Sequence, residues 1–446
     1  MFDLVIKNAR IAQADGTITN GDLACKNGRI ASIREQISNR SRETVDASGH
    51  LLLPGVIDPQ VHFRDPGAPQ KEDLASGSRA AVSGGVTSFL EMPNTHPATI
   101  GQQALDEKLK IASQKCVANY GFFIGATTNN LKALNECQPV CGIKIFMGSS
   151  TGNLLVNDKK DLDHIFASGN RLIAVHAEDE ARIRERSEHY LGSGHSKHPD
   201  VSIHSVIRDA ECAVLATQVA LELSEKYQRR LHILHLSTAR EAELLARKKP
   251  RWVTAEVIPN HLFLNQTSYQ SLGSLVQMNP PVRSKHDNEI LWQQLRAGVI
   301  DFIATDHAPH TLAEKEVSYP NSPSGMPGVE ISLRLMLTAM KEGRCNLKEL
   351  QRWMCSGPAK AYGIENKGRI AEDWDADLTI VDIDNKRQFH KEHVFSRAGW
   401  SPYQGQMLYG WTRHTIVNGQ ITFAEGKIRQ GCHGKALTFS AASTSG

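Results

Sequence analysis

Eight short apolar runs, separated by longer segments with helical spacing, constrain the fold of this 446-residue chain more than any other feature. Strands that are buried on both faces are nearly continuous in apolar residues, and their alternation with helices is typical of a parallel sheet. Eight such units predict an α/β fold with a (β/α)8 barrel of the TIM type over residues 54–369. An open, doubly wound sheet is the alternative, but no GxGxxG motif follows the first run. The runs are LLPGVIDPQVHF, GGVTSFLEMP, ANYGFFIGA, GIKIFM, RLIAVHAE, RLHILHLS, WVTAEVIP and IDFIATDHAP.

The two ends of the chain have a different texture, in which short strand-like runs are joined by tight turns. Asn27-Gly28 and Asn418-Gly419 are dipeptides that favour two-residue hairpin turns. We therefore expect residues 1–53 and 370–446 to build one small β-sandwich domain together. The small and polar residues at 436–446 predict a loose tail.

Composition and charge argue against several classes of function. The 51 basic and 48 acidic residues leave a net charge of +3, which gives no argument for nucleic acid or a membrane surface as a partner. No apolar run reaches the roughly 18 residues of a membrane helix, and the first residues lack the pattern of a signal peptide. The eight cysteines include no CxxC pair, so we expect reduced thiols in a cytoplasmic protein.

Polar side chains follow the predicted strands at the ends where a barrel of this kind carries its reactive groups. A single histidine on an apolar strand is more often a hydrogen-bonded core residue, but repetition at equivalent places argues for a site. Imidazole and carboxylate without thiolate suit zinc or a similar divalent ion in a catalytic site. The side chains at these ends are Gln60, His62, Arg64, Asn94, Lys144, His176, Glu178, His235, Asn260, His261, Asp306, His307 and His310.

Lys144 lies inside the predicted strand GIKIFM, on the face opposite Ile143 and Ile145. If the isoleucines face the helices, the lysine points into the barrel, where a buried ammonium is costly unless it is paired. Residue chemistry favours an ion pair with Asp306 or Glu178. The alternative is that carbon dioxide converts the amine into a carbamate able to bridge two metals.

Eight motifs occur in order between residues 58 and 310: DPQVHFRDPG, EMPNT, GIKIFMGSS, VHAED, HILHLS, EVIPNHLFL, NPPVR and ATDHAPH. Together they resemble the dihydroorotase family, in the cyclic amidase branch of the amidohydrolase superfamily. With the split β domain, the resemblance covers most of the chain. It implies a metal-dependent hydrolase of a small-molecule substrate, which interconverts N-carbamoyl-L-aspartate and L-dihydroorotate by metal-activated water in de novo pyrimidine biosynthesis.

The resemblance also implies which residues would hold the metal, one or two zinc ions per chain. Lys144 would be the carbamylated lysine, and His176 and His235 would bind the second metal with it. His62 and Asp306 would belong to the first metal. We expect Asp306 also to take a proton from the water and later to give it to the ring nitrogen.

Substrate recognition separates the related cyclic-amide hydrolases. The resemblance implies that Arg64 and Asn94 hold the substrate carboxylate and that His310 contributes to binding. A guanidinium two residues after His62 favours dihydroorotate over allantoin or a dihydropyrimidine, because only dihydroorotate carries a carboxylate. A loop salt bridge of Arg64 with Asp65 or Glu72 is the structural alternative.

The chain departs from the family at Gln60, where the pattern has histidine. A neutral amide oxygen is a poorer zinc ligand than imidazole, so the first metal site is weakened. The enzyme would then run with a labile first metal or with one metal. It would otherwise be a catalytically silent relative that partners aspartate transcarbamoylase. We favour activity, because a silent protein would not need the other site residues. The family also suggests a homodimer, and the small polar residues at 148–153 suggest a mobile lid.

Overall fold

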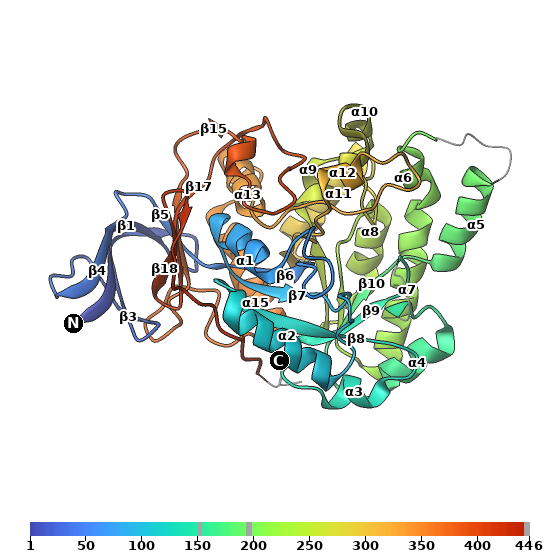
Figure 1. Cartoon of the computed structure of the whole chain (residues 1–446), viewed down its shortest axis with the longest axis horizontal. Coiled ribbons are helices and arrows are strands. Elements are labelled where there is room, and N and C mark those ends of the chain that lie inside the picture. The colour runs from blue at the N-terminus through green and yellow to red at the C-terminus, as the bar shows by residue number, and fades with distance from the viewer. Residues whose placement is uncertain (150–153, 193–198, 441–446) are drawn as a thin grey trace.

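The computed structural model describes residues 1–149, 154–192 and 199–440 and places them around two large sheets (Figure 1). In Figure 1 the sheet labelled β1, β5, β17 and β18 lies on the left, and the barrel with its surrounding helices lies on the right. The middle of the chain supplies the eight strands of the barrel sheet, whereas both ends supply the nine strands of the other sheet. The arrangement confirms the α/β barrel and the β-rich region from both chain ends.

The barrel strands follow one another around the sheet in chain order, and every neighbouring pair is parallel. The first and last strands meet where the backbone N–H of His62 donates to His307 O at 2.7 Å, beside a parallel bridge from Val61. The strands are β6 (Val56–Val61), β7 (Val86–Glu91), β8 (Asn119–Gly125), β9 (Gly142–Phe146), β10 (Ile173–His176), β11 (Leu231–Ile233), β12 (Val253–Val257) and β13 (Phe302–Ile303).

Helices cover the outside of the barrel, and the largest apolar core lies between them and the strands. Ile143 and Ile145 of β9 belong to that core, so Lys144 between them faces the barrel interior, as the alternation predicted. The helices are α1 (Leu74–Ser83), α2 (Gln102–Lys115), α3 (Leu131–Glu136), α4 (Lys159–Ala167), α5 (Glu180–Leu191), α6 (Ile203–Ile207), α7 (Ala210–Tyr227), α8 (Ala239–Lys248), α9 (Pro259–Phe263), α10 (Tyr269–Leu272), α11 (Lys285–Ala297), α12 (Leu312–Lys315), α13 (Ser332–Lys341), α14 (Leu347–Gln351) and α15 (Gly357–Tyr362).

The other large sheet joins the two ends of the chain, because β5 pairs with β1 on one side and with β14 on the other. Both predicted hairpin turns are present: Asn27 and Gly28 have φ of 52° and 80°, and Asn418 and Gly419 have 49° and 75°. The domain boundaries at 53/54 and 369/370 stay a prediction. The strands are β1 (Phe2–Ala12), β2 (Ile18–Lys26), β3 (Arg29–Arg34), β4 (Ser41–Asp46), β5 (Leu51–Pro54), β14 (Leu378–Asp382), β17 (Trp411–Val417), β18 (Gln420–Ala424) and β19 (Lys427–Ile428), with β15 (Arg387–Gln388) and β16 (Met407–Leu408) in a separate pair.

The expected loose tail is wrong for residues 436–440, which we call the C-terminal strap. The strap bonds to the barrel: Leu437 N donates to Tyr120 O and Ser440 N donates to Gly363 O, each at 2.8 Å. Leu437 is buried, and Phe439 packs against the same apolar cluster. These two apolar side chains explain why the strap packs against the barrel. Residues 441–446 lie outside the described ranges.

Two expectations about the whole chain can be compared with the structure. All eight cysteines are free, as their spacing predicted. Among the residues that the structure describes, no helix combines the length and the apolar character needed to cross a membrane.

Candidate active site

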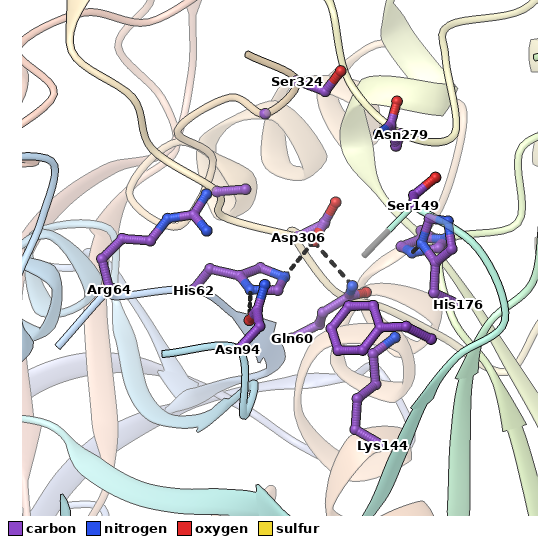
Figure 2. A pocket seen from close by; sticks show the side chains of 14 residues that line it. Gln60, His62, Arg64, Asn94, Lys144, Ser149, His176, Asn279, Asp306 and Ser324 are labelled. Carbon is purple, nitrogen blue, oxygen red and sulfur yellow. Dashed lines mark hydrogen bonds and ion pairs between the residues drawn. The ribbon is translucent and has the colours of Figure 1, made fainter. Parts of the chain in front are cut away.

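A cavity of about 100 Å³ lies at the carboxyl ends of the barrel strands (Figure 2). Eight of the nine residues predicted for the site line it, and the ninth, His310, contacts it through Arg64. The lining residues are Gln60, His62, Arg64, Asn94, Lys144, Phe146, Ser149, His176, His235, Asn279, Asp306, Ala308, Ser324 and Gly325.

Four of the lining residues have left-handed backbone conformations that residues other than glycine rarely adopt. Arg64, Ser149, His235 and Asp306 have φ of 61°, 58°, 37° and 49°. Each such conformation costs about 1–3 kcal/mol and persists where the surrounding structure enforces it, often at functional sites. Their concentration around one cavity supports a functional role for it.

The first cluster centres on Asp306, on which Gln60 and His62 converge (Figure 2). Gln60 Nε2 donates to Asp306 Oδ1 at 2.9 Å, and His62 Nε2 lies 3.1 Å from the same oxygen. His62 Nδ1 lies 2.7 Å from Asn94 Oδ1, which accepts, so Nδ1 carries a proton. Burial lowers the pKa of His62. The neutral imidazole then turns its Nε2 lone pair toward a carboxylate oxygen. These two electron-rich atoms repel each other, and a cation bound between them would remove the repulsion.

The second cluster is a pair of buried histidines, His176 and His235. His176 Nδ1 and His235 Nε2 face each other at 3.0 Å, while His176 Nε2 donates to Glu178 Oε2 at 2.9 Å. Burial would raise the pKa of Glu178, but the guanidinium of Arg208 at 2.6 Å and the bond from His176 outweigh it and hold that pKa well below its usual range. The ionised carboxylate fixes the His176 tautomer and leaves its Nδ1 lone pair turned toward the cavity.

Lys144 does not form the ion pair that residue chemistry favoured, so that prediction is wrong. No ion pair joins it to any residue in the described ranges, and its Nζ lies 4.3 Å from the centroid of the Phe146 ring. The two expected partners are held elsewhere, since Asp306 accepts from Gln60 and Glu178 pairs with Arg208. Burial lowers the pKa of Lys144 to about 7, so a large share of the amine is neutral near physiological pH.

The donor atoms around the cavity suit a divalent metal, although the clusters are incomplete by themselves. Two zinc–nitrogen bonds of about 2.0–2.1 Å at a tetrahedral angle place the two nitrogens roughly 3.3 Å apart, close to the spacing of His176 and His235. Within residues 1–149, 154–192 and 199–440, no group of three or more His, Cys, Asp or Glu side chains is placed to hold a metal. Each cluster supplies two such side chains, and the third position falls to Gln60 or Lys144.

Arg64 presents an unpaired guanidinium to the cavity. Its Nε is buried without a partner, and among the described residues no carboxylate forms an ion pair with it. The nearby acids are already engaged: Asp65 pairs with Lys115 at 2.8 Å, and Glu72 accepts from Ser396 and Arg397. The structural alternative for Arg64, a loop salt bridge, is therefore wrong.

His310 supports Arg64 from outside the cavity. Its Nε2 lies 3.4 Å from Arg64 Nη2 and 3.1 Å from Ser324 O, while its Nδ1 lies 3.1 Å from Lys71 Nζ. Burial and the positive charges of Arg64 and Lys71 lower the pKa of His310 to about 2, so the imidazole is neutral. The end of the cavity at Arg64 is thus positively charged, and it lies beside Asp306.

The sequence placed two residues of the seventh strand at the rim, and the structure turns both elsewhere. Asn260 accepts from the Tyr403 hydroxyl at 2.8 Å, and His261 bonds to Pro280 O at 3.1 Å. The polar lining residues that sequence reasoning did not assign are Asn279, Ser149 and Ser324, all on loops. The NPPVR motif contains Asn279 and the GIKIFMGSS motif contains Ser149, and these were the available signals.

The predicted lid lies partly outside the described residues, since 150–153 are not among them. Ser149, at its start, is anchored: its N–H donates to Glu180 Oε2 at 3.0 Å and its hydroxyl to Glu178 Oε2 at 3.1 Å. Ser149 therefore belongs to the cavity wall.

Comparison with known proteins agrees with this geometry. The model of the amidohydrolase family matches residues 51–422. The chain belongs to the amidohydrolase family. Two relatives within it are dihydroorotases: that of Methanosarcina acetivorans is 36% identical, over 96% of this chain and 93% of the relative, and that of Methanothermobacter thermautotrophicus is 32% identical, over 97% and 96%. The amidohydrolase L-hydantoinase (dihydropyrimidinase) from Arthrobacter aurescens has the same fold, with a TM-score of 0.92 at 30% identity over 98% of this chain and all of the solved one. The resemblance inferred from the motifs is confirmed.

Proposed function

We propose that the chain is a dihydroorotase, which interconverts N-carbamoyl-L-aspartate and L-dihydroorotate in de novo pyrimidine biosynthesis. The observation that carries the proposal is the unpaired guanidinium of Arg64 in the same cavity as Asp306. Dihydroorotate has a ring amide to hydrolyse and a carboxylate to be gripped, whereas hydantoin and dihydrouracil lack the carboxylate. The sequence relatives named dihydroorotase support the same substrate.

Binding begins with the substrate carboxylate. Arg64 would grip it through two parallel N–H bonds, and Asn94 would donate a further bond from its amide nitrogen. Neutral His310 lies against the guanidinium and brings no charge that would compete for the anion. The Asn94 carbonyl is occupied by His62, so its amide nitrogen is the end available to substrate.

We propose that His176, His235 and a carbamate on Lys144 would hold the second metal as zinc, and that His62, Asp306 and the same carbamate would hold the first metal more weakly, with Gln60 in doubt as a ligand. The neutral amine that burial favours at Lys144 is the form that reacts with carbon dioxide. When bound, a divalent metal supplies a water of lowered pKa and polarises the attacked carbonyl.

Proton transfer falls to Asp306. Gln60 donates to its Oδ1, which leaves Oδ2 as the oxygen able to accept a proton. Asp306 would take the proton of the attacking water and give it to the ring nitrogen as the carbon–nitrogen bond breaks. In the reverse direction it takes the proton of the carbamoyl nitrogen as the carbon–nitrogen bond forms, and gives it to the hydroxyl that leaves the carboxyl carbon as water.

The test is turnover of dihydroorotate, dihydrouracil, hydantoin and allantoin by the purified chain, with zinc measured on the same sample. Turnover of dihydroorotate above the other three supports the proposal, and preference for any other ring replaces it with a different cyclic amidase. No turnover after zinc and bicarbonate are supplied, together with co-purification of aspartate transcarbamoylase, would make the chain a silent subunit. A homodimer and a cytoplasmic location stay proposals, to be measured by light scattering and fractionation.

A further inference from the structure

A second cavity, of about 490 Å³, lies at the opposite end of the barrel. Its wall includes Gly142 at the start of β9 and Leu172 and Arg230 just before β10 and β11, so it opens at the amino ends of the strands. The C-terminal strap closes one side through Phe439. Barrel enzymes carry their chemistry at the other end, so the proposed reaction does not account for this space. Its volume falls in the range of small-molecule sites.

Two guanidiniums line this cavity without a counterion. Arg171 donates to Leu134 O at 2.9 Å and Arg230 donates to Ala361 O at 2.7 Å. Within the described residues neither arginine forms an ion pair. Each guanidinium has further N–H groups beyond the one used, and these are matched by neither a carboxylate nor a carbonyl of the described chain.

Two buried groups beside the arginines also lack partners. Arg229 is 2% exposed, and its Nε and Nη2 have no hydrogen-bond partner, although Nη1 donates to Ser168 O at 2.6 Å. Burial and the neighbouring charge of Arg171 lower the pKa of Arg229 to about 10. The Tyr362 side chain lines the cavity, and its buried hydroxyl has no partner either. Arg229 does not line the cavity and the Tyr362 hydroxyl is shielded from it, so the charge that an anion would compensate is that of Arg171 and Arg230.

The remaining wall is apolar and partly aromatic. Leu172, Val140 and Pro139 line it together with the rings of Tyr362 and Phe439. Such a surface suits the flat apolar part of a small molecule. The arginines are then free to bind a charged group of the same molecule. Phosphate and carboxylate both match the fork of a guanidinium, with phosphate carrying the larger charge.

We propose that this cavity binds a small organic anion, with its phosphate or carboxylate at Arg171 and Arg230 and its flat apolar body against Leu172 and Phe439. The site is separate from the proposed active site and independent of that reaction.

The experiment titrates the full-length protein with 1-naphthyl phosphate, 1-naphthoate and the uncharged 1-naphthol, by calorimetry. We expect saturable binding of the phosphate or the carboxylate, and the tighter of the two identifies the anion. Binding of naphthol as tight as that of both anions would overturn the proposal, because the arginines would then contribute nothing. Absence of saturable binding of either anion in the millimolar range would overturn it as well.

Variants locate the binding. Arg171→Ala and Arg230→Ala should each weaken the anion at least about tenfold, since each removes charge-assisted bonds. Arg251→Ala, which removes an exposed arginine before β12, is the matched control and should change nothing.

Arg64→Ala distinguishes the two cavities, because an anion could also enter the proposed active site. Binding that survives Arg64→Ala and is lost in Arg230→Ala supports the proposal, and the opposite pattern refutes it. Thermal melting checks that each variant is folded, and dihydroorotate turnover is a second check for the variants of Arg171, Arg230 and Arg251. Arg230→Lys, which keeps the charge and loses the fork, serves if an alanine variant does not fold, and it should again weaken binding while Arg251→Lys does not.

Discussion

The side-chain amide of Gln60 donates to Oδ1 of Asp306 across 2.9 Å, while its own Oε1 is buried without a partner. The residue that departs from the family pattern therefore holds the carboxylate that we assign to proton transfer. An amide in this position orients Asp306 through its nitrogen and offers only a weak oxygen ligand to a metal. Gln60 thus has a positioning role that does not require it to coordinate.

Replacing Gln60 with histidine should raise the metal content. The wild-type chain should hold about one zinc ion, between His176 and His235, and Gln60→His should add an imidazole to His62 and Asp306 and bring the content to about two. Metal analysis of dialysed protein measures this without relying on turnover. Gln60→Ala is the control, with unchanged zinc but a turnover about tenfold lower because Asp306 is no longer held. Two firmly bound ions in the wild type would refute this account.

Asp306→Asn should abolish most of the turnover and leave the fold intact. Asparagine keeps the shape and tolerates the left-handed backbone at this position, where φ is 49°. It cannot take up a proton, so kcat should fall by about 10²–10⁴-fold. Turnover of dihydroorotate and a thermal melt measure the two effects. A variant with a tenth or more of wild-type kcat would remove Asp306 from the proposed role.

Arg64→Lys should change substrate recognition more than chemistry. Lysine keeps the charge and loses the two-bond fork, so KM for dihydroorotate should rise roughly tenfold or more with kcat little changed. Any activity toward dihydrouracil, which has no carboxylate, should stay the same and serves as the internal control. Equal losses on both substrates would mean that Arg64 supports the cavity wall and does not read the carboxylate.

The barrel could be predicted from the sequence because its strands are short, apolar and regularly spaced. Part of the site could be predicted because side chains alternate between the two faces of a strand, a pattern that depends only on neighbouring residues. Gln60 and Lys144 lie within β6 and β9 and point inward for that reason, whereas His62 and Arg64 follow the end of β6 at Val61 and Arg64 has a left-handed backbone. Asn279 was not assigned, because its position depends on loop contacts far apart in the chain, such as its bond to His204.

The ion pairs were the other feature that could not be predicted from residues close together in the sequence. Lys144 and the acids Asp306 and Glu178 do line or border one cavity, but Asp306 accepts from Gln60 and Glu178 pairs with Arg208. Arg208 lies 30 residues after Glu178 in the sequence, and no period or motif connects the two. The strap was missed likewise, because the pairing of residues 436–440 with the barrel depends on partners more than 70 residues away.

His204 gives the chain a pH dependence that can be separated from the metal site. Its Nε2 donates to Met278 O at 3.0 Å and to Asn279 Oδ1 at 2.9 Å, which holds the Asn279 side chain at the cavity wall. Burial and the charge of Arg208 lower the pKa of His204 to about 4.

Below its unfolded pKa of about 6.5, the unfolded chain takes up a proton at His204 that the folded chain refuses. Stability should therefore fall as the pH drops from about 6.5 to 4, by an amount on the order of 3 kcal/mol at the lower end. His204→Gln keeps a donor and does not titrate, so its free energy of unfolding should depend less on pH over this interval. Urea unfolding of both proteins at several pH values measures the difference. Parallel curves would show that His204 is not the group responsible.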